Sequence, residues 1–346
     1  MTNRARLGTF ACKLAAALLL SMGAMAATSA ADSLGDAVSV EAELLARVQR
    51  MAGGPLWVRQ GQLTNQAREL IGVLRRVEDF GLATEEFAPL VSAIEFAAAT
   101  GGDPARLEAS MNVAALRLIR HLHDGRVDPR LAGYELSRGR APIDPVATLR
   151  HLAASPSPPA TLSAVEPRAP QYRALKQMLA RYRGMTARPV TPPPENTLIR
   201  AGTAYVGAAD LRHLLTAFGD LEESGGPASA DPRVYDATLA RAVARFQRRH
   251  ALQADGILGP RTMAALAVPI AQRIRQIELT LERWRWLPEM RAPTVIVNVP
   301  QFVLYTLPDP AADDPAQTLE IPVIVGQQER QTPVFDSRIE AVVIRP

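Results

Sequence analysis

Cysteine is almost missing from the sequence, since Cys12 is the only one among 346 residues. It precedes the apolar run of an N-terminal segment with the features of an export signal, so it is misplaced for lipid attachment and is lost on cleavage. The mature chain then has no thiol. It can form no disulfide, although export leads to an oxidising compartment, and it offers no cysteine nucleophile or thiolate metal ligand.

The export signal is predicted at residues 1–30. Basic residues at positions 4, 6 and 13 precede an apolar run at 14–20, and small residues end the segment near Ala30, which is the order of regions in a cleaved signal peptide. The run is shorter than the ~20 residues that a membrane-spanning helix needs. An uncleaved N-terminal anchor is the alternative interpretation. We expect an exported protein of the periplasm or cell envelope.

The chain also lacks a marked excess of charge. Its 39 Lys and Arg against 35 Asp and Glu give +4, and removing the three basic residues of the signal leaves 36 − 35 = +1. Clustered positive charge supplies most of the affinity for nucleic acid, which is therefore excluded as a partner. Phosphate-loop, Gly-x-Ser-x-Gly and His-Glu-x-x-His motifs are absent as well. We therefore expect no bound metal, no cofactor and no hydrolase mechanism of the kinds that these motifs support.

Length and composition predict a folded protein of two or three domains, because 47% of the residues are hydrophobic and 21% are charged. The region 38–185 carries apolar residues at three- and four-residue spacing and is predicted to be helical. The expected helices are 41–48, 66–80, 85–100, 105–123, 145–154 and 172–183. Asp103 is expected to cap the fourth of these, with Pro104 at its first position.

Proline marks two stretches, 155–170 and 188–194. Because proline is excluded from helix interiors, both are expected to be loops or linkers, and the second is the better domain boundary.

A small three-helix unit is predicted at 197–268. Its first helix has an apolar stripe that ends at Gly219 and consists of Leu211, Leu214, Leu215 and Phe218. The second helix is expected after Asp231-Pro232 and the third from Pro260. A long amphipathic helix follows at 269–287, and then the apolar period changes to two. This change predicts strands at 294–299, 302–307, 319–325 and 339–344.

The stretches 235–247 (YDATLARAVARFQ) and 252–266 (LQADGILGPRTMAAL) carry a specific motif. They resemble the peptidoglycan-binding domain of cell-wall enzymes. Most of the motif is interpreted as structural, with Phe246 in the core and Gly256 permitting the turn. The resemblance implies peptidoglycan, its glycan strands and stem peptides, as partner. Direct contact is assigned to polar residues near the turn, namely Gln247, Asp255, Arg261 and Thr262, in a shallow groove with hydrogen-bonding edges.

Further matching stretches are 111–129, 283–288, 297–304, Val325-Gly326 and Thr332-Pro333. Together with the domain order they resemble the multi-domain L,D-transpeptidases of bacterial envelopes. The resemblance implies an α+β multidomain fold in these segments: a signal peptide at 1–30, a mainly helical scaffold domain at 38–185, a proline-rich linker at 186–196, the three-helix peptidoglycan-binding domain at 197–268, a connecting helix at 269–288, and the first strands of an incomplete mainly-β catalytic domain at 289–346.

In that family a cysteine thiolate attacks a stem peptide, D-alanine leaves, and an amine completes a 3→3 cross-link. The family's Ser-x-Gly-Cys-x-Arg motif is absent and no cysteine follows Cys12, so we assign no catalytic residue and expect the chain as given to be inactive. Three explanations of the missing motif stay open: a fragment, a truncated or frameshifted reading frame, and a genuine non-catalytic protein. Because the sequence ends within a strand pattern, truncation is the favoured one.

Two non-catalytic functions are the alternatives. One is a module that holds peptidoglycan without chemistry. The other is a scaffold that binds partner enzymes of the envelope through the helical region 38–185. The oligomeric state stays open.

Two remaining features are interpreted as structural. His121 and His123 are two apart on a helix and point to different faces, which disfavours a metal site. Trp284 and Trp286 flank Arg285, and stacking on sugar rings is the alternative function for them. Trp284 is expected to belong to the apolar stripe and to pack against the strand domain.

Overall fold

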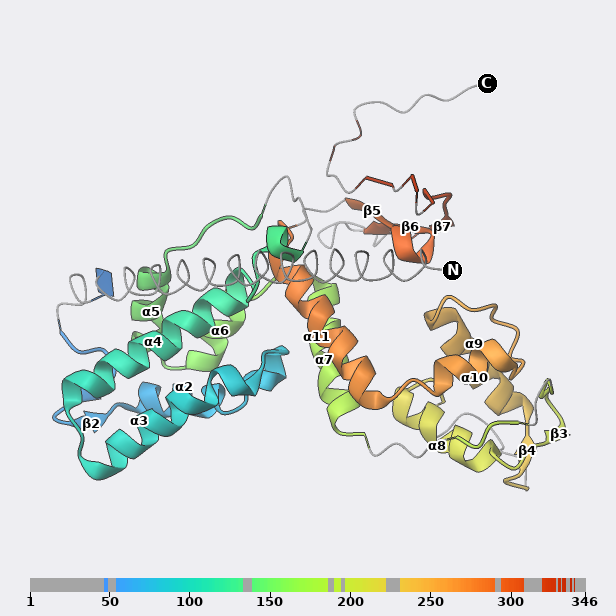
Figure 1. Cartoon of the computed structure of the whole chain (residues 1–346), viewed down its shortest axis with the longest axis horizontal. Helices are drawn as coiled ribbons and strands as arrows, with labels where there is room; N and C mark the ends of the chain where they lie inside the picture. The colour runs from blue at the N-terminus through green and yellow to red at the C-terminus, as the bar shows by residue number, and fades with distance from the viewer. Residues whose placement is uncertain are drawn as a thin grey trace, which may run out of the picture. The chain divides into compact units, whose positions relative to one another are not determined.

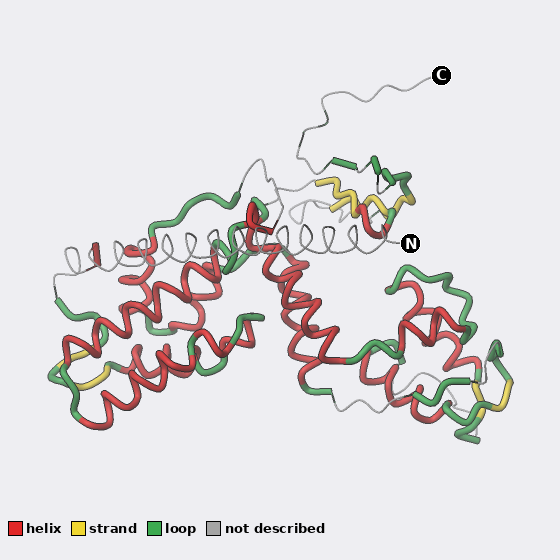
Figure 2. Tube along the Cα trace, in the orientation of Figure 1, coloured by secondary structure: helices red, strands yellow, loops and turns green. Residues whose placement is uncertain are grey.

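The computed structural model describes residues 47–48, 54–132, 139–185, 190–193, 197–221, 231–289, 294–307, 319–327, 329–330, 332–333, 337 and 339. Helices dominate these residues, and the strands form small antiparallel sheets (Figure 2). The predicted signal peptide at 1–30 lies outside them, as do most of the predicted helix at 41–48 and the strand at 339–344 apart from its first residue. None of the described helices is both long and apolar enough to cross a membrane.

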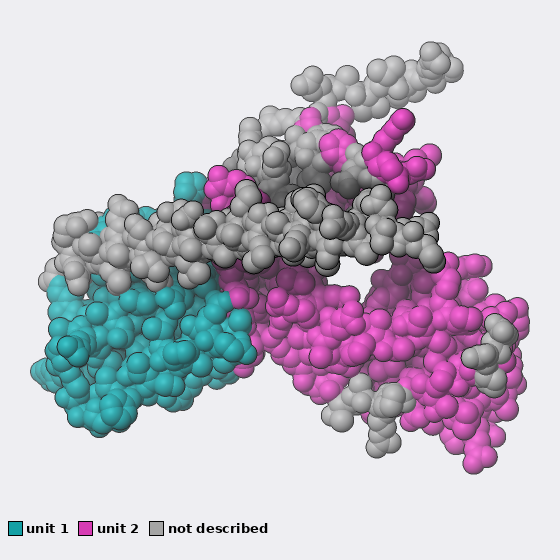
Figure 3. Space-filling view, in the orientation of Figure 1, with its two compact units in different colours: residues 1–77, 83–123, 142–165 teal, residues 78–82, 124–141, 166–346 magenta. Residues whose placement is uncertain are grey.

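The chain divides into two compact units (Figure 3). The first comprises residues 1–77, 83–123 and 142–165, and the second comprises 78–82, 124–141 and 166–346. The short 3₁₀ helices along the chain are η1 (Val77–Phe80), η2 (Thr84–Glu86), η3 (Pro129–Ala132) and η4 (Val299–Gln301).

The first unit is a helical assembly around α4 (Figure 1). Its helices are α2 (Asn65–Leu74), α3 (Ala88–Thr100), α4 (Pro104–His123), α5 (Pro145–Ala154) and α6 (Pro158–Val165). Side chains of α4 at three- and four-residue spacing are fully buried, among them Met111, Leu118 and Leu122, because α4 packs against all four other helices. The predicted start of α4 is confirmed, since Asp103 Oδ1 accepts a hydrogen bond from the backbone N–H of Ala105 at 3.0 Å.

A short hairpin, β1 (Val58–Arg59) and β2 (Gln62–Leu63), closes one end of this unit. Glu108 on α4 holds it, because its carboxylate accepts hydrogen bonds from the backbone N–H groups of Leu56, Trp57 and Val58 at 2.7, 2.9 and 3.0 Å. The buried indole of Trp57 donates to Asn112 Oδ1 at 2.8 Å. Sequence periodicity did not predict this hairpin, because two-residue strands are too short to show alternation.

The expectation that residues 155–170 form a loop is wrong, because α6 (Pro158–Val165) lies within that stretch and buries Leu162. Pro158 and Pro159 are the first two residues of the helix. The backbone N–H groups of a first turn have no partner within the helix, so proline there costs no hydrogen bond. Proline excludes a helix interior but permits a helix start.

In the second unit α7 (Pro170–Arg183) packs against α11 (Ile270–Trp286). Their shared core is Tyr172, Leu179 and Leu281, and Trp284 packs against it. Trp284 thus belongs to the apolar stripe of α11, as predicted, and it packs against the core that α7 and α11 share. The reason is its place in the stripe of α11, which continues the step from Leu281 by three residues.

A buried polar network joins the same helices. The guanidinium of Arg285, which is 1% exposed, donates to Glu282 Oε2 and to the hydroxyl of Tyr172, both at 3.1 Å. That hydroxyl donates to Glu166 Oε1 at 2.8 Å, and the ammonium of Lys176 lies 2.7 Å from Glu166 Oε2. Each of these charges therefore has a partner of opposite sign, as burial requires.

Residues 197–268 contain α8 (Ala208–Phe218), α9 (Ala237–Arg249) and α10 (Pro260–Leu266), with a strand pair β3 (Thr203–Ala204) and β4 (Val234–Tyr235). The predicted stripe of α8 is buried and Gly219 ends the helix in the left-handed region with φ 82°. The second helix begins later than expected, because residues 234–235 pair with 203–204. Asp236 then caps α9 by accepting from the backbone N–H of Leu239 at 2.8 Å.

The strand region forms a three-stranded antiparallel sheet in the order β5-β6-β7, with β5 (Thr294–Asn298), β6 (Val303–Leu307) and β7 (Glu320–Pro322). The first three predicted strands are thus confirmed, although the third is shorter than expected. Val297 pairs with Leu304, which pairs with Ile321, so these three side chains share one face. Val297 and Ile321 are about half exposed on it.

Candidate functional site

The turn between α9 and α10 is organised by one buried amide, that of Gln247. Its Nε2 lies 3.0 Å from each of three acceptors, which are Asp255 Oδ1, the backbone oxygen of Ile257 and Thr262 Oγ1. Its Oε1 accepts from the backbone N–H of Gly256 at 2.8 Å. Gln247 is only 2% exposed. Its hydrogen bonds are therefore made within the domain, and they tie the end of α9 to the turn and to the start of α10.

The turn itself has little freedom. Asp255 Oδ1 also accepts from the backbone N–H of Ile257 at 2.9 Å, and Gly256 has φ 67°, in the left-handed region that favours glycine. A Cβ at Gly256 would lie 2.7 Å from the backbone oxygen of Ala240. The buried Tyr235 hydroxyl donates to the backbone oxygen of Gly256 at 2.7 Å, and desolvation raises the pKa of Tyr235, so the hydroxyl keeps its proton.

A shallow hollow of about 210 Å³ lies over this turn. Its lining residues are Leu198, Gln247, Leu252, Gln253, Asp255, Ile257, Gly259, Pro260, Arg261 and Thr262. We refer to these ten residues as the turn groove. Leu198 comes from the segment before α8 and reaches the groove because Ile199 and Leu258 form a β-bridge, with N–O distances of 3.2 and 3.0 Å.

The structure brings all four sequence-predicted site residues together in the turn groove, in two different situations. Gln247 and Thr262 are buried and bond to each other, so they support the groove from below. Asp255 and Arg261 are exposed. Within the described part of the chain Asp255 Oδ2 and the Arg261 guanidinium have no hydrogen-bond partner, which leaves both available to a ligand.

Sequence reasoning missed Leu198 and Gln253. Gln253 is an exposed amide in the same turn, and its position inside the motif was a signal that could have found it. Leu198 lies outside the motif, and only the β-bridge of its neighbour Ile199 places it at the groove.

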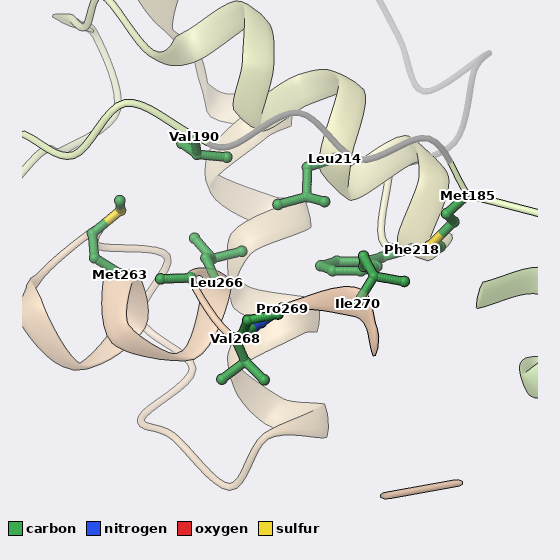
Figure 4. Close-up of a pocket in the computed structure, with 10 residues that line it drawn as sticks. Met185, Val190, Leu214, Phe218, Met263, Leu266, Val268, Pro269 and Ile270 are labelled. Atoms are coloured by element: carbon green, nitrogen blue, oxygen red, sulfur yellow. The ribbon is translucent and has the colours of Figure 1, made fainter. Parts of the chain in front are cut away.

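A larger hollow of about 460 Å³ lies where α8, α10 and the start of α11 meet (Figure 4). It is lined by Met185, Val190, Leu214, Phe218, Met263, Leu266, Ala267, Val268, Pro269 and Ile270. Every lining side chain is apolar. A polar ligand needs hydrogen-bonding groups at defined positions, which the side chains here do not supply.

A third hollow of about 510 Å³ lies in the first unit beside the hairpin and α4. Glu108 and Asn112 are among its lining residues. The carboxylate oxygens of Glu108 already accept hydrogen bonds from the backbone of residues 56–58, and Asn112 Oδ1 accepts one from the Trp57 indole. The turn groove is therefore the better candidate for a polar ligand.

Ionisable groups elsewhere in the chain play structural parts. His121 lies 3.5 Å from a carboxylate oxygen of Glu86 and makes an edge contact with the ring of Phe87. Burial, together with the neighbouring guanidinium groups of Arg249 and Arg273, lowers the pKa of His250 to about 4, so that its ring is neutral at pH 7. Across the described ranges no group of three His, Cys, Asp or Glu side chains is placed to hold a metal ion.

Two family models match the chain. One is described as Scaffold domain and matches residues 49–179, and the other is described as Putative peptidoglycan binding domain and matches residues 207–266. No match was found among curated proteins. The two domains in this order fit an L,D-transpeptidase-like architecture, and the second supports a cell-wall-associated role with peptidoglycan as partner. The second match includes every lining residue of the turn groove except Leu198.

Proposed function

We propose that this chain is an exported protein of the cell envelope that binds peptidoglycan through the turn groove. The observation that carries the proposal is that two buried side chains fix the turn while two exposed polar side chains face solvent beside it. Gln247 and Thr262 hold the turn from beneath, while Asp255 and Arg261 face solvent at its rim. Pre-organised polar edges bind a polar polymer without the entropic cost of ordering them first.

The finer proposal is that the chain is the scaffold and wall-binding part of an L,D-transpeptidase-type protein, with residues 289–346 beginning a catalytic domain. The domain order and the antiparallel sheet at 294–322 support this. Cys12 is the only thiol in these 346 residues and it lies in the predicted signal. We therefore expect no cross-link formation by these residues alone, because the acyl transfer needs a thiolate.

Co-sedimentation with purified sacculi tests the binding function. The chain without residues 1–30 is expected to pellet with sacculi above the level of an unrelated protein of similar charge, and failure to do so would exclude the proposal. For the finer proposal, the coding DNA past Pro346 is expected to contain Ser-x-Gly-Cys-x-Arg, in frame or displaced by one base. Unrelated sequence there would count against it.

A second candidate function is a scaffold for envelope enzymes through the helical region 38–185. It is favoured by the Scaffold domain match and by Phe96 on α3, whose side chain is 72% exposed. Pull-down from an envelope extract distinguishes the two functions. Capture of enzymes that survives deletion of residues 197–268, and is lost in Phe96→Ser, would support the scaffold, whereas capture that needs residues 197–268 would refute it.

A further inference from the structure

The chemistry of the turn groove selects one part of peptidoglycan. We propose that the groove recognises the stem peptide, through its carboxylates, and not the glycan strand; this inference rests on the proposed function. Its lining offers a guanidinium from Arg261, a carboxylate from Asp255 and an amide from Gln253, beside an apolar wall of Leu198 and Leu252. A stem peptide presents matching groups, namely free carboxylates, N–H groups and the methyl groups of alanine.

Arg261 is placed to bind a carboxylate. Its neighbour Thr262 is fixed by the hydrogen bond to Gln247, so the backbone that carries Arg261 is held, while its own side chain is exposed. A guanidinium presents two parallel N–H donors that match the two oxygens of a carboxylate. In intact peptidoglycan the lactyl carboxyl groups of the glycan strand are amide-linked to the stem peptides, so the strand itself offers hydroxyl and acetamido groups but no carboxylate.

Asp255 supplies the negative charge of the groove and can accept a hydrogen bond from the stem peptide. Its Oδ1 is used by Gln247 and by the backbone N–H of Ile257, at 3.0 and 2.9 Å. This fixes the carboxylate plane and leaves Oδ2 to accept from an N–H or ammonium group of the ligand. A groove with one fixed acceptor and one cationic donor suits a peptide that carries both charges.

The size and lining of the groove agree with this assignment. At about 210 Å³ it is smaller than the roughly 300–1,000 Å³ of pockets that enclose a small molecule. It can hold one or two residues of a chain that continues into solvent. No aromatic ring lines it, so a sugar ring has no flat surface to stack on, whereas the exposed Leu198 offers a contact for an alanine methyl group.

The experiment compares two polymers and four single variants of the full chain. The polymers are intact sacculi and glycan strands from which an N-acetylmuramoyl-L-alanine amidase has removed the stem peptides. The lactyl carboxylates that this cleavage exposes are converted to methylamides, so that the stripped strands carry no carboxylate. The variants are Arg261→Gln, Arg261→Lys, Asp255→Asn and the control Arg248→Gln. Arg248 is likewise exposed, lies in the same domain and is not among the groove residues.

We expect the unsubstituted chain to bind intact sacculi and to lose at least tenfold in affinity for stripped strands. Arg261→Gln is expected to weaken binding to sacculi about tenfold, the effect of losing one charge-assisted pair at an exposed site, and Arg248→Gln to leave it unchanged. Arg261→Lys should recover part of the loss, since it restores the charge but not the fork. Asp255→Asn keeps Oδ1 and its two internal bonds, so a decrease in binding with unchanged thermal stability reports the ligand contact of Oδ2.

Equal binding to stripped and intact polymer, or equal affinities for Arg261→Gln and Arg248→Gln, would overturn the stem-peptide assignment while leaving peptidoglycan binding in place. A lack of binding by the unsubstituted chain to intact sacculi would remove both proposals. Circular dichroism of each variant separates loss of a contact from loss of folding.

Discussion

Replacement of Gln247 by leucine tests whether one amide holds the turn groove together. Leucine is similar in size but has no hydrogen-bonding group. The change removes the amide from the backbone N–H of Gly256, the hydroxyl of Thr262 and the backbone oxygen of Ile257. Gly256 and Thr262 are buried, whereas Ile257 is half-buried. Asp255 is exposed and can bond to water instead.

The magnitude follows from the two groups on buried residues, the N–H of Gly256 and the hydroxyl of Thr262. A buried polar group without a partner costs about 1–3 kcal/mol. Thr262 Oγ1 keeps a weak contact of 3.5 Å with the backbone oxygen of Ile257, so the lower part of the range applies to it. We expect Gln247→Leu to lower the free energy of local opening by about 2–4 kcal/mol, which corresponds to about 30- to 700-fold faster amide exchange at the turn.

Hydrogen exchange measured by mass spectrometry on a peptide covering residues 252–260 is the suitable assay, because a chain of several domains need not unfold in one step. The control is Gln253→Leu, an exposed amide of the same turn for which no hydrogen bond is found among the described residues, and we expect a change within about 0.5 kcal/mol. Thr262→Val combined with Gln247→Leu should cost less than the sum of the single changes. Exchange less than threefold faster in Gln247→Leu, or additive single changes, would refute the reasoning.

Three further predictions concern other parts of the chain. Glu108→Ala is expected to destabilise the first unit by about 2–4 kcal/mol, because three backbone N–H groups lose their acceptor. Hydrogen exchange measured on a peptide covering residues 56–63 checks this, and exchange as slow as in the original chain would contradict it. Asp144→Ala should remove the N-cap of α5 and lower the free energy of unfolding by about 1 kcal/mol. Because the backbone N–H of Ala147 lowers the pKa of Asp144, the cap stabilises the protein above the ordinary pKa of aspartate, and this contribution is lost as pH falls through the lowered pKa. An effect of Asp144→Ala on stability that persists undiminished at pH 2 would argue against this. The pKa of His250 is lowered to about 4, so the unfolded chain binds the proton more readily, and the free energy of unfolding should fall as pH decreases from about 6.5 to about 4. The thermal unfolding midpoint of His250→Gln should therefore depend less on pH in that interval. A pH dependence equal to that of the original chain would contradict the lowered pKa.

Local sequence patterns predicted most helices well. The helix expected at 145–154 is α5 with the same bounds, and the stripe from Leu211 to Phe218 is the buried face of α8. Both patterns report interactions between residues three or four apart, which exist in any helix with one buried face. Asp103 and Gly219 marked helix ends for the same local reason, since a cap requires only its nearest backbone neighbours.

The errors share a different cause. The loop predicted at 155–170 rests on the number of prolines in the stretch. What decides whether a helix forms is where each proline stands, and in the first turn of α6 proline removes no hydrogen bond. The pairing of residues 203–204 with 234–235 depends on contacts between segments far apart in the chain. Periodicity reports that a side chain is buried and not which segment covers it.

By itself the sequence determined the helical patterns, the absence of a thiol beyond Cys12, and the four polar residues assigned to the site. The tertiary structure alone divided those four into two buried supports and two exposed groups, and it added Leu198 to them through the bridge between Ile199 and Leu258. The physical reason is that exposure and hydrogen-bond partners are properties of packing, because a glutamine has the same donors and acceptor in any sequence, and its neighbours in space decide whether they bind the protein or a ligand.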